Sequence, residues 1–291
     1  MKDIKLIVDT GSDISPEIAE KYNIGVLRFL TLFGEDTYVQ GVDITNDEFF
    51  EKLEKFPGFP TSSQTPYADM YDFLKKEAQI HDHVIYFALS SAASGQFQTA
   101  TLISRDIMEE DPSLDIRVVD TMKYSLYIVN AVVHAAEMIR AGANVDEVIE
   151  ECSHFIYTWR CFLLVDTLKY LEKGGRLSKT AAFVGGLLDI KPILGIEGGL
   201  VVKSGQLRGK KKLLDKLMTK IEEDEDFIAC DKKEFLIVQS DDRKGREAAR
   251  MLKERYGEDC LKIYGEFGPL IGTHVGKGAV AVLARVACEV R

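Results

Sequence analysis

The chain has 291 residues, of which 46% are hydrophobic and 29% charged, an ordinary composition for a globular protein. This length allows one large domain or two of ordinary size. The formal net charge is −10, and the acidic residues are spread along the sequence. A nucleic-acid partner is therefore not expected, because such binding depends on a basic surface. No apolar run approaches the length of a membrane span.

Cysteine and histidine spacing limits the chemistry further. The five cysteines form no close-spaced pair, and no secretory signal precedes the sequence MKDIKLIVD. We therefore expect reduced thiols and a cytoplasmic location. The five histidines show no zinc-type spacing, so no metal site is expected. Neither a Gly-x-Gly-x-x-Gly nor a Walker-type loop occurs, and no cofactor is predicted.

Strand and helix patterns alternate through the first half of the chain. Apolar runs predict extended segments at 4–9, 23–34, 84–89 and 115–120. Caps and helical apolar spacing predict helices after Ser15, after the third of these segments, and at 45–56, 67–78 and 125–141. The segment PGFPTSSQTP, at 57–66, is predicted to be a loop because proline and glycine punctuate it. Such alternation predicts a mainly parallel sheet with helices on both faces.

The second half predicts a second α/β domain, which is richer in glycine and basic residues. Its predicted elements are helices at 145–157, 168–174 and 242–257, strands at 161–167 and 234–240, and a hairpin around Gly198-Gly199. The run RGKKKLLDKLMTK predicts a basic patch on a helix, and the stretch from residue 268 predicts a turn between apolar runs. We place the two domains at 1–157 and 158–291, with the chain free to cross between them more than once.

Polar side chains follow three predicted strands of the first domain. Asp9 follows one strand, Ser90, Ser91 and Ser94 follow another, and Asp120 follows a third. In sheets of this kind, ligands bind beyond the carboxyl ends of the strands. Because a helix begins after the serines, its first N–H groups and the hydroxyls suit an anion or a carbonyl oxygen. In the alternative interpretation, one serine simply caps the helix.

Two enzyme interpretations have less support. Asp9 and Asp120 could form a catalytic pair, but carboxylates at strand ends more often accept backbone N–H groups of the following loop. A serine-dependent acyl hydrolase could use Ser94, His274 and Asp120 as a triad. The sequence AASGQ, however, lacks the first glycine of the Gly-x-Ser-x-Gly elbow that would position such a serine.

A series of motifs in chain order carries a family resemblance. They are LIVDTGSDIS, PTSSQTP, LSSAASGQFQTA, VVDT, LKYLEKGGRLSKTAAFVGGLLDIKPIL, GQLRGKKK and GPLIGTHVGKGA. From about residue 4 to the C-terminus, the sequence resembles the DegV family of bacterial fatty-acid-binding proteins. The segment Leu168–Leu194 is the most specific part, because a long pattern of glycine, arginine and lysine seldom arises by chance.

The resemblance implies a two-domain α/β protein that holds one long-chain fatty acid, such as palmitate, in an internal tunnel. Lipid transport or fatty acid metabolism is the implied role. The residues implied at the carboxylate are Ser62, or its neighbour Thr61, together with Ser91 and Ser94. His274 matches the histidine of the family's closing motif, near the carboxylate.

The resemblance also implies partners. In one branch of the family, the bound acid is presented to a separate kinase that phosphorylates its carboxylate. The chain itself is then expected to be a carrier and not an enzyme. Arg176 and Arg208, expected in flexible basic loops, are the implied kinase contacts. A transient contact with a membrane surface is a further expectation.

Some residues depart from the family's motifs. Ser62 stands where threonine is usual, and Thr65 stands where a proline often follows. Gln96 and Phe97 stand where threonine and tyrosine are more usual. These differences leave the fold prediction unchanged and the preferred acyl chain open.

Overall fold

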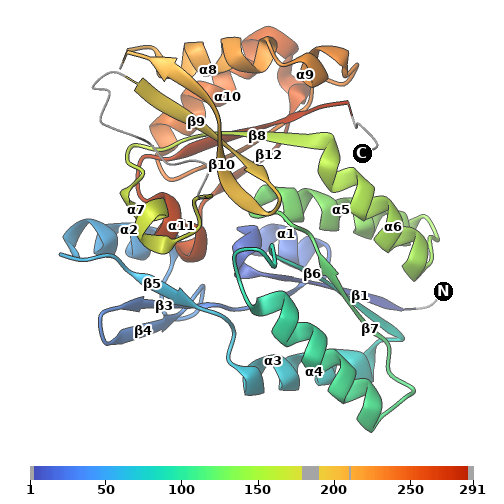
Figure 1. Cartoon of the computed structure of the whole chain (residues 1–291). Coiled ribbons are helices and arrows are strands. Elements are labelled where there is room, and N and C mark those ends of the chain that lie inside the picture. Colours follow the sequence, from blue (N-terminus) through green and yellow to red (C-terminus); the bar gives the residue numbers. More distant parts are fainter. Residues whose placement is uncertain (1–2, 179–189, 210, 288–291) are drawn as a thin grey trace. The chain divides into compact units, whose positions relative to one another are not determined.

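The structure is a computed structural model that describes residues 3–178, 190–209 and 211–287 (Figure 1). Contacts within the chain divide it into two compact units. The first unit ends at Ile156 and also includes the segment Gly268–Ile271, whereas the second unit holds the remainder. The two domains expected at 1–157 and 158–291 stay a prediction.

The first unit contains the parallel sheet that the sequence predicts. Its strands are Ile4–Asp9 (β1), Gly25–Leu27 (β2), His83–Ala88 (β6) and Ile116–Asp120 (β7). All pairings are parallel, in the order β2-β1-β6-β7. Val8 pairs with Phe87, and Ala88 pairs with Asp120. The carboxyl ends of the strands therefore meet at one edge of the sheet.

Helices cover both faces of this sheet, as Figure 1 shows. They are Tyr67–Ile80 (α3) and Gln96–Glu110 (α4) on one face, and Leu126–Arg140 (α5) and Val145–Phe155 (α6) on the other. Ile7 and Tyr86 point toward α3 and α4, whereas Val8 and Phe87 point toward α5 and α6. Since successive strand residues face opposite sides, a strand covered on both sides is apolar throughout.

The first unit also holds a small antiparallel sheet in the order β4-β3-β5. Its strands are Leu30–Phe33 (β3), Asp36–Val39 (β4) and Thr61–Ser63 (β5). The prediction of a loop at 57–66 is therefore wrong for β5, because pairing with β3 holds these residues in an extended strand. Phe33 of β3 packs on Phe49 of the helix Asn46–Lys55 (α2), with 5.6 Å between the ring centroids.

Local capping explains where the first helices begin. The helix Pro16–Lys21 (α1) follows Ser15, whose hydroxyl accepts a hydrogen bond from the backbone N–H of Ile18. Helix α2 follows Thr45, which forms a capping box with Glu48. The first start was predicted from Ser15, whereas the second helix was predicted at 45–56 without its capping box.

The second unit contains a mixed sheet in the order β10-β9-β8-β13-β11-β12. Its strands are Trp159–Leu164 (β8), Ile190–Glu197 (β9), Leu200–Arg208 (β10), Phe235–Gln239 (β11), Leu261–Glu266 (β12) and Val280–Arg285 (β13). Its helices are Lys169–Gly174 (α7), Leu213–Glu222 (α8), Glu225–Ala229 (α9), Asp242–Tyr256 (α10) and Pro269–Val275 (α11), whose first residues belong to the first unit. Single 3-10 turns lie at Thr10–Ser12, Ile156–Thr158 and Glu258–Cys260.

Both faces of the second sheet are apolar. Helices α8, α9 and α10 pack on one face, which carries Phe162, Phe235 and Val282. The alternate residues of the same strands, such as Leu236 and Leu283, lie on the opposite face and pair directly across β11 and β13. This sheet therefore has two apolar faces: the three helices pack on one, and Leu236 and Leu283 on the other are also buried, at 0% and 1% exposed.

Two turn predictions for the second unit had different outcomes. Gly198 and Gly199 join β9 to β10 with φ values of 53° and 73°, the left-handed conformation of a two-residue hairpin turn. The hairpin prediction is thus confirmed. The stretch from residue 268 was predicted as a turn, but it contains the helix α11. Residues 179–189, in the middle of the Leu168–Leu194 motif, lie outside the described residues.

The described part of the chain also bears on cysteines and membranes. Cys152, Cys230 and Cys260 have free thiols, and Cys288 lies outside the described residues. Among the described helices, none combines the length and the apolar character needed to cross a bilayer.

Candidate functional site

The candidate site begins with a serine-rich loop at the carboxyl end of β6, which we call the serine loop and define as Ser90–Ser94. The loop closes on itself, since the N–H of Ser94 donates to the carbonyl of Ser90 over 3.2 Å. It is also attached to the next strand, because the N–H of Ser91 donates to Oδ1 of Asp120 over 3.1 Å. Ser91 and Ser94 are half-buried. The serine loop is therefore ordered by its own turn and by a strand-end carboxylate.

The start of α4 differs from the capping alternative. Gly95 is the N-cap residue of α4, and no side chain caps this helix. The Ser94 hydroxyl accepts a hydrogen bond from the N–H of Gln96 over 3.3 Å. Neither Ser91 nor Ser94 occupies the N-cap position, although Ser94 does satisfy one N–H of the first turn.

The two strand-end carboxylates have the role predicted for them. Asp120 accepts from the N–H groups of Ser91 and Met122, each over 3.1 Å. Asp9 accepts from the N–H groups of Gly11 and Leu89, over 2.8 and 3.0 Å. Both carboxylates therefore anchor the loops that follow the strands, and the prediction of backbone anchors is confirmed for each.

Asp9 is fully buried and also accepts a hydrogen bond from the Tyr86 hydroxyl over 2.7 Å. Burial raises the pKa of Asp9 to about 6, and the donors from Leu89, Tyr86 and Gly11 limit that rise. The buried carboxylate is thus surrounded by donors, as a buried charge requires.

A second hydroxyl-rich segment, Thr61–Thr65, lies in the same unit and contains β5. The pairing of β5 with β3 places Ser62 opposite Thr31 and Thr61 opposite Leu32. Directly opposed residues point to the same face of a sheet, so Ser62 shares a face with the fully buried Thr31. Thr61 points to the other face and is exposed, whereas Ser62 is half-buried. The structure therefore gives Thr61 and Ser62 opposite orientations.

The structure joins this segment to the serine loop through residues that the sequence analysis did not select. The Thr65 N–H donates to Oε1 of Gln96 over 3.2 Å, and the Gln96 amide donates back to the Thr65 hydroxyl over 3.0 Å. Thr99 and Gln64 add a longer bond of 3.3 Å. Gln96 and Thr65 had been noted only as departures from a family pattern, and no local sequence signal pairs residues 31 positions apart.

A further carboxylate, that of the half-buried Asp13, was also missed. Its Oδ1 accepts from the N–H of Gly268 over 2.8 Å, and its Oδ2 accepts from the hydroxyl of Ser125. Burial raises the pKa of Asp13 to about 8; the bonds to Ser125 and Gly268 oppose this rise, and the charge of Asp9 adds to it. The backbone of Asp13 has the left-handed conformation, with a φ of 56°, which Asp and Asn tolerate better than most residues.

The other predicted site residues belong to the second unit. His274 lies on α11, and its Nδ1 is buried without a hydrogen-bond partner among the described residues. Burial lowers the pKa of His274 to about 4, and the nearby charge of Arg176 contributes. A Cβ atom added at Gly174 would collide with the imidazole ring, so glycine is needed there. The imidazole is therefore neutral at pH 7.

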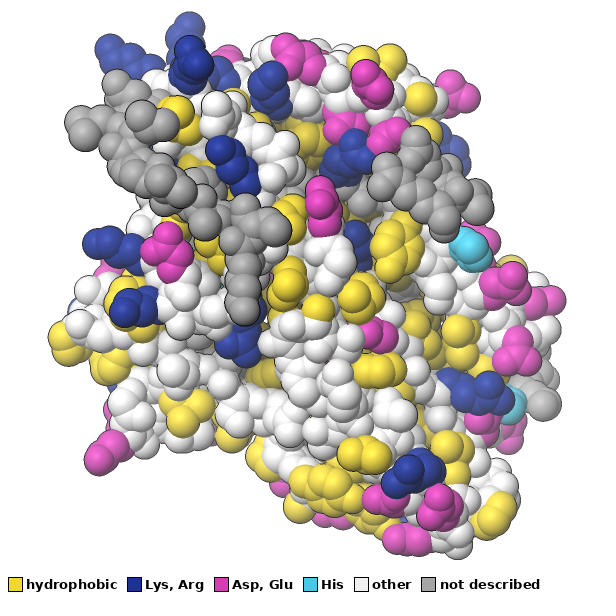
Figure 2. All heavy atoms as spheres, in the orientation of Figure 1, with side chains coloured by type: hydrophobic (Ala, Val, Ile, Leu, Met, Phe, Trp, Pro, Cys, Tyr) yellow, Lys and Arg dark blue, Asp and Glu magenta, His cyan; other side chains and the backbone are white. Residues whose placement is uncertain are grey.

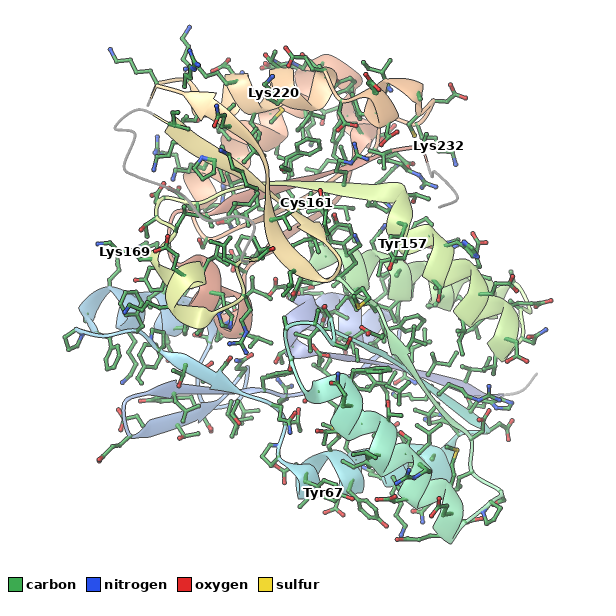
Figure 3. The ribbon with its side chains drawn as sticks, viewed as in Figure 1. Tyr67, Tyr157, Cys161, Lys169, Lys220 and Lys232 are labelled. Atoms are coloured by element: carbon green, nitrogen blue, oxygen red, sulfur yellow. The ribbon has the colours of Figure 1, made fainter. Side chains whose placement is uncertain are left out.

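The two arginines expected in flexible loops are placed differently. Arg176 is half-buried and donates to the carbonyl of Gly174. Arg208 is the last residue of β10, where it pairs with Ile190, so its prediction as a loop residue is wrong. Arg208 is exposed, and Figure 2 shows Lys and Arg side chains gathered near α8, the helix that carries Lys220 in Figure 3.

The hydrolase triad gains no support from these contacts. Asp120 accepts from the backbone N–H groups of Ser91 and Met122, and the Ser94 hydroxyl accepts from the backbone N–H of Gln96. Ser94 and Asp120 belong to the first unit, and His274 belongs to the second.

Comparison with known proteins identifies the family. A family model described as "Uncharacterised protein, DegV family" matches residues 3–286. The chain belongs to the DegV family. A DegV domain-containing protein of Caldanaerobacter subterraneus subsp. tengcongensis is 30% identical over 291 residues, which cover 97% of this chain and 98% of that protein. Protein DegV of Bacillus subtilis is 29% identical over 282 residues, 96% of this chain and 98% of the relative.

Solved DegV structures match nearly the whole chain. The fatty acid binding DegV family protein of Streptococcus agalactiae is 29% identical, with a TM-score of 0.85, over 98% of this chain and 99% of that one. DegV of Bacillus subtilis, a fatty acid binding protein, is 28% identical, with a TM-score of 0.83, and the match covers 98% of this chain and 100% of that one. The predicted family and the predicted two-part α/β fold are therefore confirmed.

Proposed function

We propose that this DegV-family chain binds a long-chain fatty acid, such as palmitate, in an internal tunnel and carries it for lipid transport or fatty acid metabolism. The observation that supports this most strongly is the match to two DegV proteins described as fatty acid binding, each over nearly the full chain. In this proposal the chain is a carrier and performs no reaction on the acid by itself.

The acyl tail supplies the affinity in this proposal. Burying one methylene contributes about 0.8 kcal/mol, so a chain of ~16 carbons contributes about 12 kcal/mol before the entropy of binding is subtracted. Such a tail needs an extended apolar surface. Leu236 and Leu283 are candidates to line that surface, because they are apolar, buried from solvent and on the face of the second sheet opposite to α8, α9 and α10.

The head group then needs only to be satisfied by hydrogen bonds. We propose Ser62, Ser91 and Ser94 as donors, and Ser62 in preference to Thr61 because Ser62 shares the face of buried Thr31. His274 is a suitable further donor, since its Nδ1 is buried without a partner among the described residues and its ring is neutral at pH 7. Neutral donors leave the carboxylate oxygen freer to accept a phosphoryl group than a buried arginine would.

Mass spectrometry of the denatured, purified protein tests the carrier function, and a co-purified fatty acid is the expected result. Displacement of a fluorescent fatty acid then tests the residues. Ser62→Ala and Ser91→Ala should each weaken palmitate binding by about tenfold or more, because each removes one hydrogen bond to a charged group. Thr61→Ala, on the opposite face of β5, is the matched control and should leave the affinity unchanged. Absence of bound lipid together with no measurable binding would overturn the proposal.

We further propose that a fatty acid kinase takes the bound acid from this chain and phosphorylates its carboxylate. Arg208 is the better residue for testing kinase docking because it is exposed, whereas Arg176 also lowers the pKa of His274 through its charge. Arg208→Ala should leave palmitate affinity unchanged and slow acyl phosphate formation by a partner kinase. The control is Arg250→Ala, an exposed arginine on α10. Equal loss of binding and phosphorylation would place Arg208 in the lipid site instead.

The proposal places the carrier in the cytoplasm, with transient contact at a membrane surface when it collects or delivers lipid. Sedimentation with phosphatidylglycerol vesicles tests that contact. The hydrolase alternative predicts steady hydrolysis of a nitrophenyl ester that is lost in Ser94→Ala, and we expect neither. Such activity would favour the hydrolase.

A further inference from the structure

We infer that Gln96 is a positioning residue for the carboxylate site, because its side chain holds the Thr61–Thr65 segment against the start of α4, next to the serine loop. This inference rests on the proposed function, and it assigns to Gln96 the geometry that the proposed hydroxyl donors depend on. Gln96 itself does not contact the ligand in this scheme. We call its paired hydrogen bonds with Thr65 the Gln96–Thr65 clamp.

The clamp is buried and reciprocal. Gln96 is fully buried and Thr65 is 3% exposed. The Thr65 N–H donates to Oε1 of Gln96 over 3.2 Å, and Nε2 of Gln96 donates to Oγ1 of Thr65 over 3.0 Å. The Thr65 hydroxyl uses its own hydrogen to reach the carbonyl of Arg28, over 3.0 Å. Leaving such buried groups unpaired is costly, so the clamp resists opening.

The surrounding network fixes the orientation of the Gln96 amide. The amide also hydrogen-bonds the hydroxyl of Tyr86, which in turn donates to Asp9 over 2.7 Å. Nε2 therefore faces two hydroxyl oxygens whose hydrogens are already used, and Oε1 faces a backbone N–H. Only an amide supplies two donors and an acceptor in this arrangement, since a carboxylate has no hydrogen to offer.

The clamp joins the two segments that carry the proposed hydroxyl donors. Ser62 is three residues before Thr65, and Ser94 is two residues before Gln96 and accepts its backbone N–H. Asp9, at the far end of the network, accepts the N–H of Leu89, directly before the serine loop. One connected set of buried bonds thus orders both hydroxyl segments, and a site held in its binding geometry binds a carboxylate more tightly.

A comparison of two ligands separates positioning from a general structural role. Palmitate has a carboxylate and hexadecanol does not, while both have a tail of the same length. Gln96→Ala should weaken palmitate binding about tenfold and leave hexadecanol within about twofold of the parent protein. Thr65→Val removes one bond of the clamp and keeps the other, so a smaller loss for palmitate alone is expected. Gln98→Ala, an exposed position on the same helix, is the control and should change neither affinity.

The outcomes distinguish this inference from the proposed function. If the parent protein binds neither ligand, the fatty acid function fails and the inference fails with it. If the parent protein binds palmitate and the variants keep its affinity, or lose palmitate and hexadecanol equally, only the positioning role is overturned. Thr65→Val is nearly the same shape as the parent side chain and keeps the test available if Gln96→Ala does not fold. Thermal unfolding of each variant, measured in parallel, records any loss of stability.

Discussion

Substitution of Asp13 by asparagine should remove a pH-dependent cost from the folded protein. Asp13 is a half-buried residue whose carboxyl accepts hydrogen bonds from Gly268 and Ser125, and desolvation of this carboxyl raises its pKa to about 8. Asparagine tolerates the left-handed backbone of this position. Its amide oxygen can still accept from Gly268, and its NH₂ group can donate to the Ser125 hydroxyl, which can reverse its role. The variant therefore keeps the contacts and loses the charge.

The expected magnitude follows from the difference between the folded and unfolded pKa values. The folded value of about 8 lies above the ordinary value of 3.8, so between these limits the folded state binds more protons. The stability of the parent protein must then fall as the pH rises, by up to about 1.4 kcal/mol per pH unit. Between pH 6 and pH 8 this amounts to about 2 kcal/mol, since the slope flattens near the folded pKa.

Denaturant unfolding at pH 6, 7 and 8 measures this effect. The free energy of unfolding of Asp13→Asn minus that of the parent protein should increase by about 2 kcal/mol from pH 6 to pH 8. Asp69→Asn, at an exposed carboxylate on α3, is the control and should show a constant difference. A difference between Asp13→Asn and the parent protein that does not change with pH would refute the reasoning, because Asp13 would then be ionised in the folded state throughout.

Three further predictions concern Leu270, the segment 268–271 and His274. Leu270→Ala should destabilise the protein by about 2–5 kcal/mol in denaturant unfolding, since Leu270 is 4% exposed in the first unit's core; a loss below about 1 kcal/mol would contradict that placement. The fragment 1–157 should show a lower melting temperature by circular dichroism than a fragment extended with a linked copy of 268–271, because it lacks this side chain. His274→Gln should make the free energy of unfolding less sensitive to acid. In the parent protein the folded pKa of His274, about 4, lies below its ordinary value of 6.5, so the stability of the parent falls as the pH drops from 6.5 to 4, by at most about 3 kcal/mol. An unchanged acid profile would show that His274 is protonated in the folded protein.

Sequence reasoning predicted the parallel sheet because its evidence is local. A strand buried on both faces must be apolar at every position, and β1 and β6 show this directly. Polar residues at the ends of these strands then converge at one edge by the geometry of parallel pairing. The same reasoning placed Asp9 and Asp120 correctly as anchors of the following loops.

The features that were missed depend on distant partners. Strand β5 consists of a threonine and two serines and has no apolar run, so only its pairing with β3 defines it. The Gln96–Thr65 clamp and the bond between Asp13 and Gly268 join residues 31 and 255 positions apart. Side chains of these types are also common in exposed loops, so their burial could not be predicted from composition.

The placement of Gly268–Ile271 in the first unit has a consequence for synthesis on the ribosome. The first unit is otherwise complete at Ile156, but its core awaits Leu270, which is made 114 residues later (270 − 156). At about 5–20 residues per second, that delay is roughly 6–23 s. During this time the nascent first unit has an unfilled core position beside Gly11 and an Asp13 carboxylate without its Gly268 partner. Nascent chains stalled before residue 268 should therefore bind chaperones more than chains stalled beyond residue 271 and fully emerged.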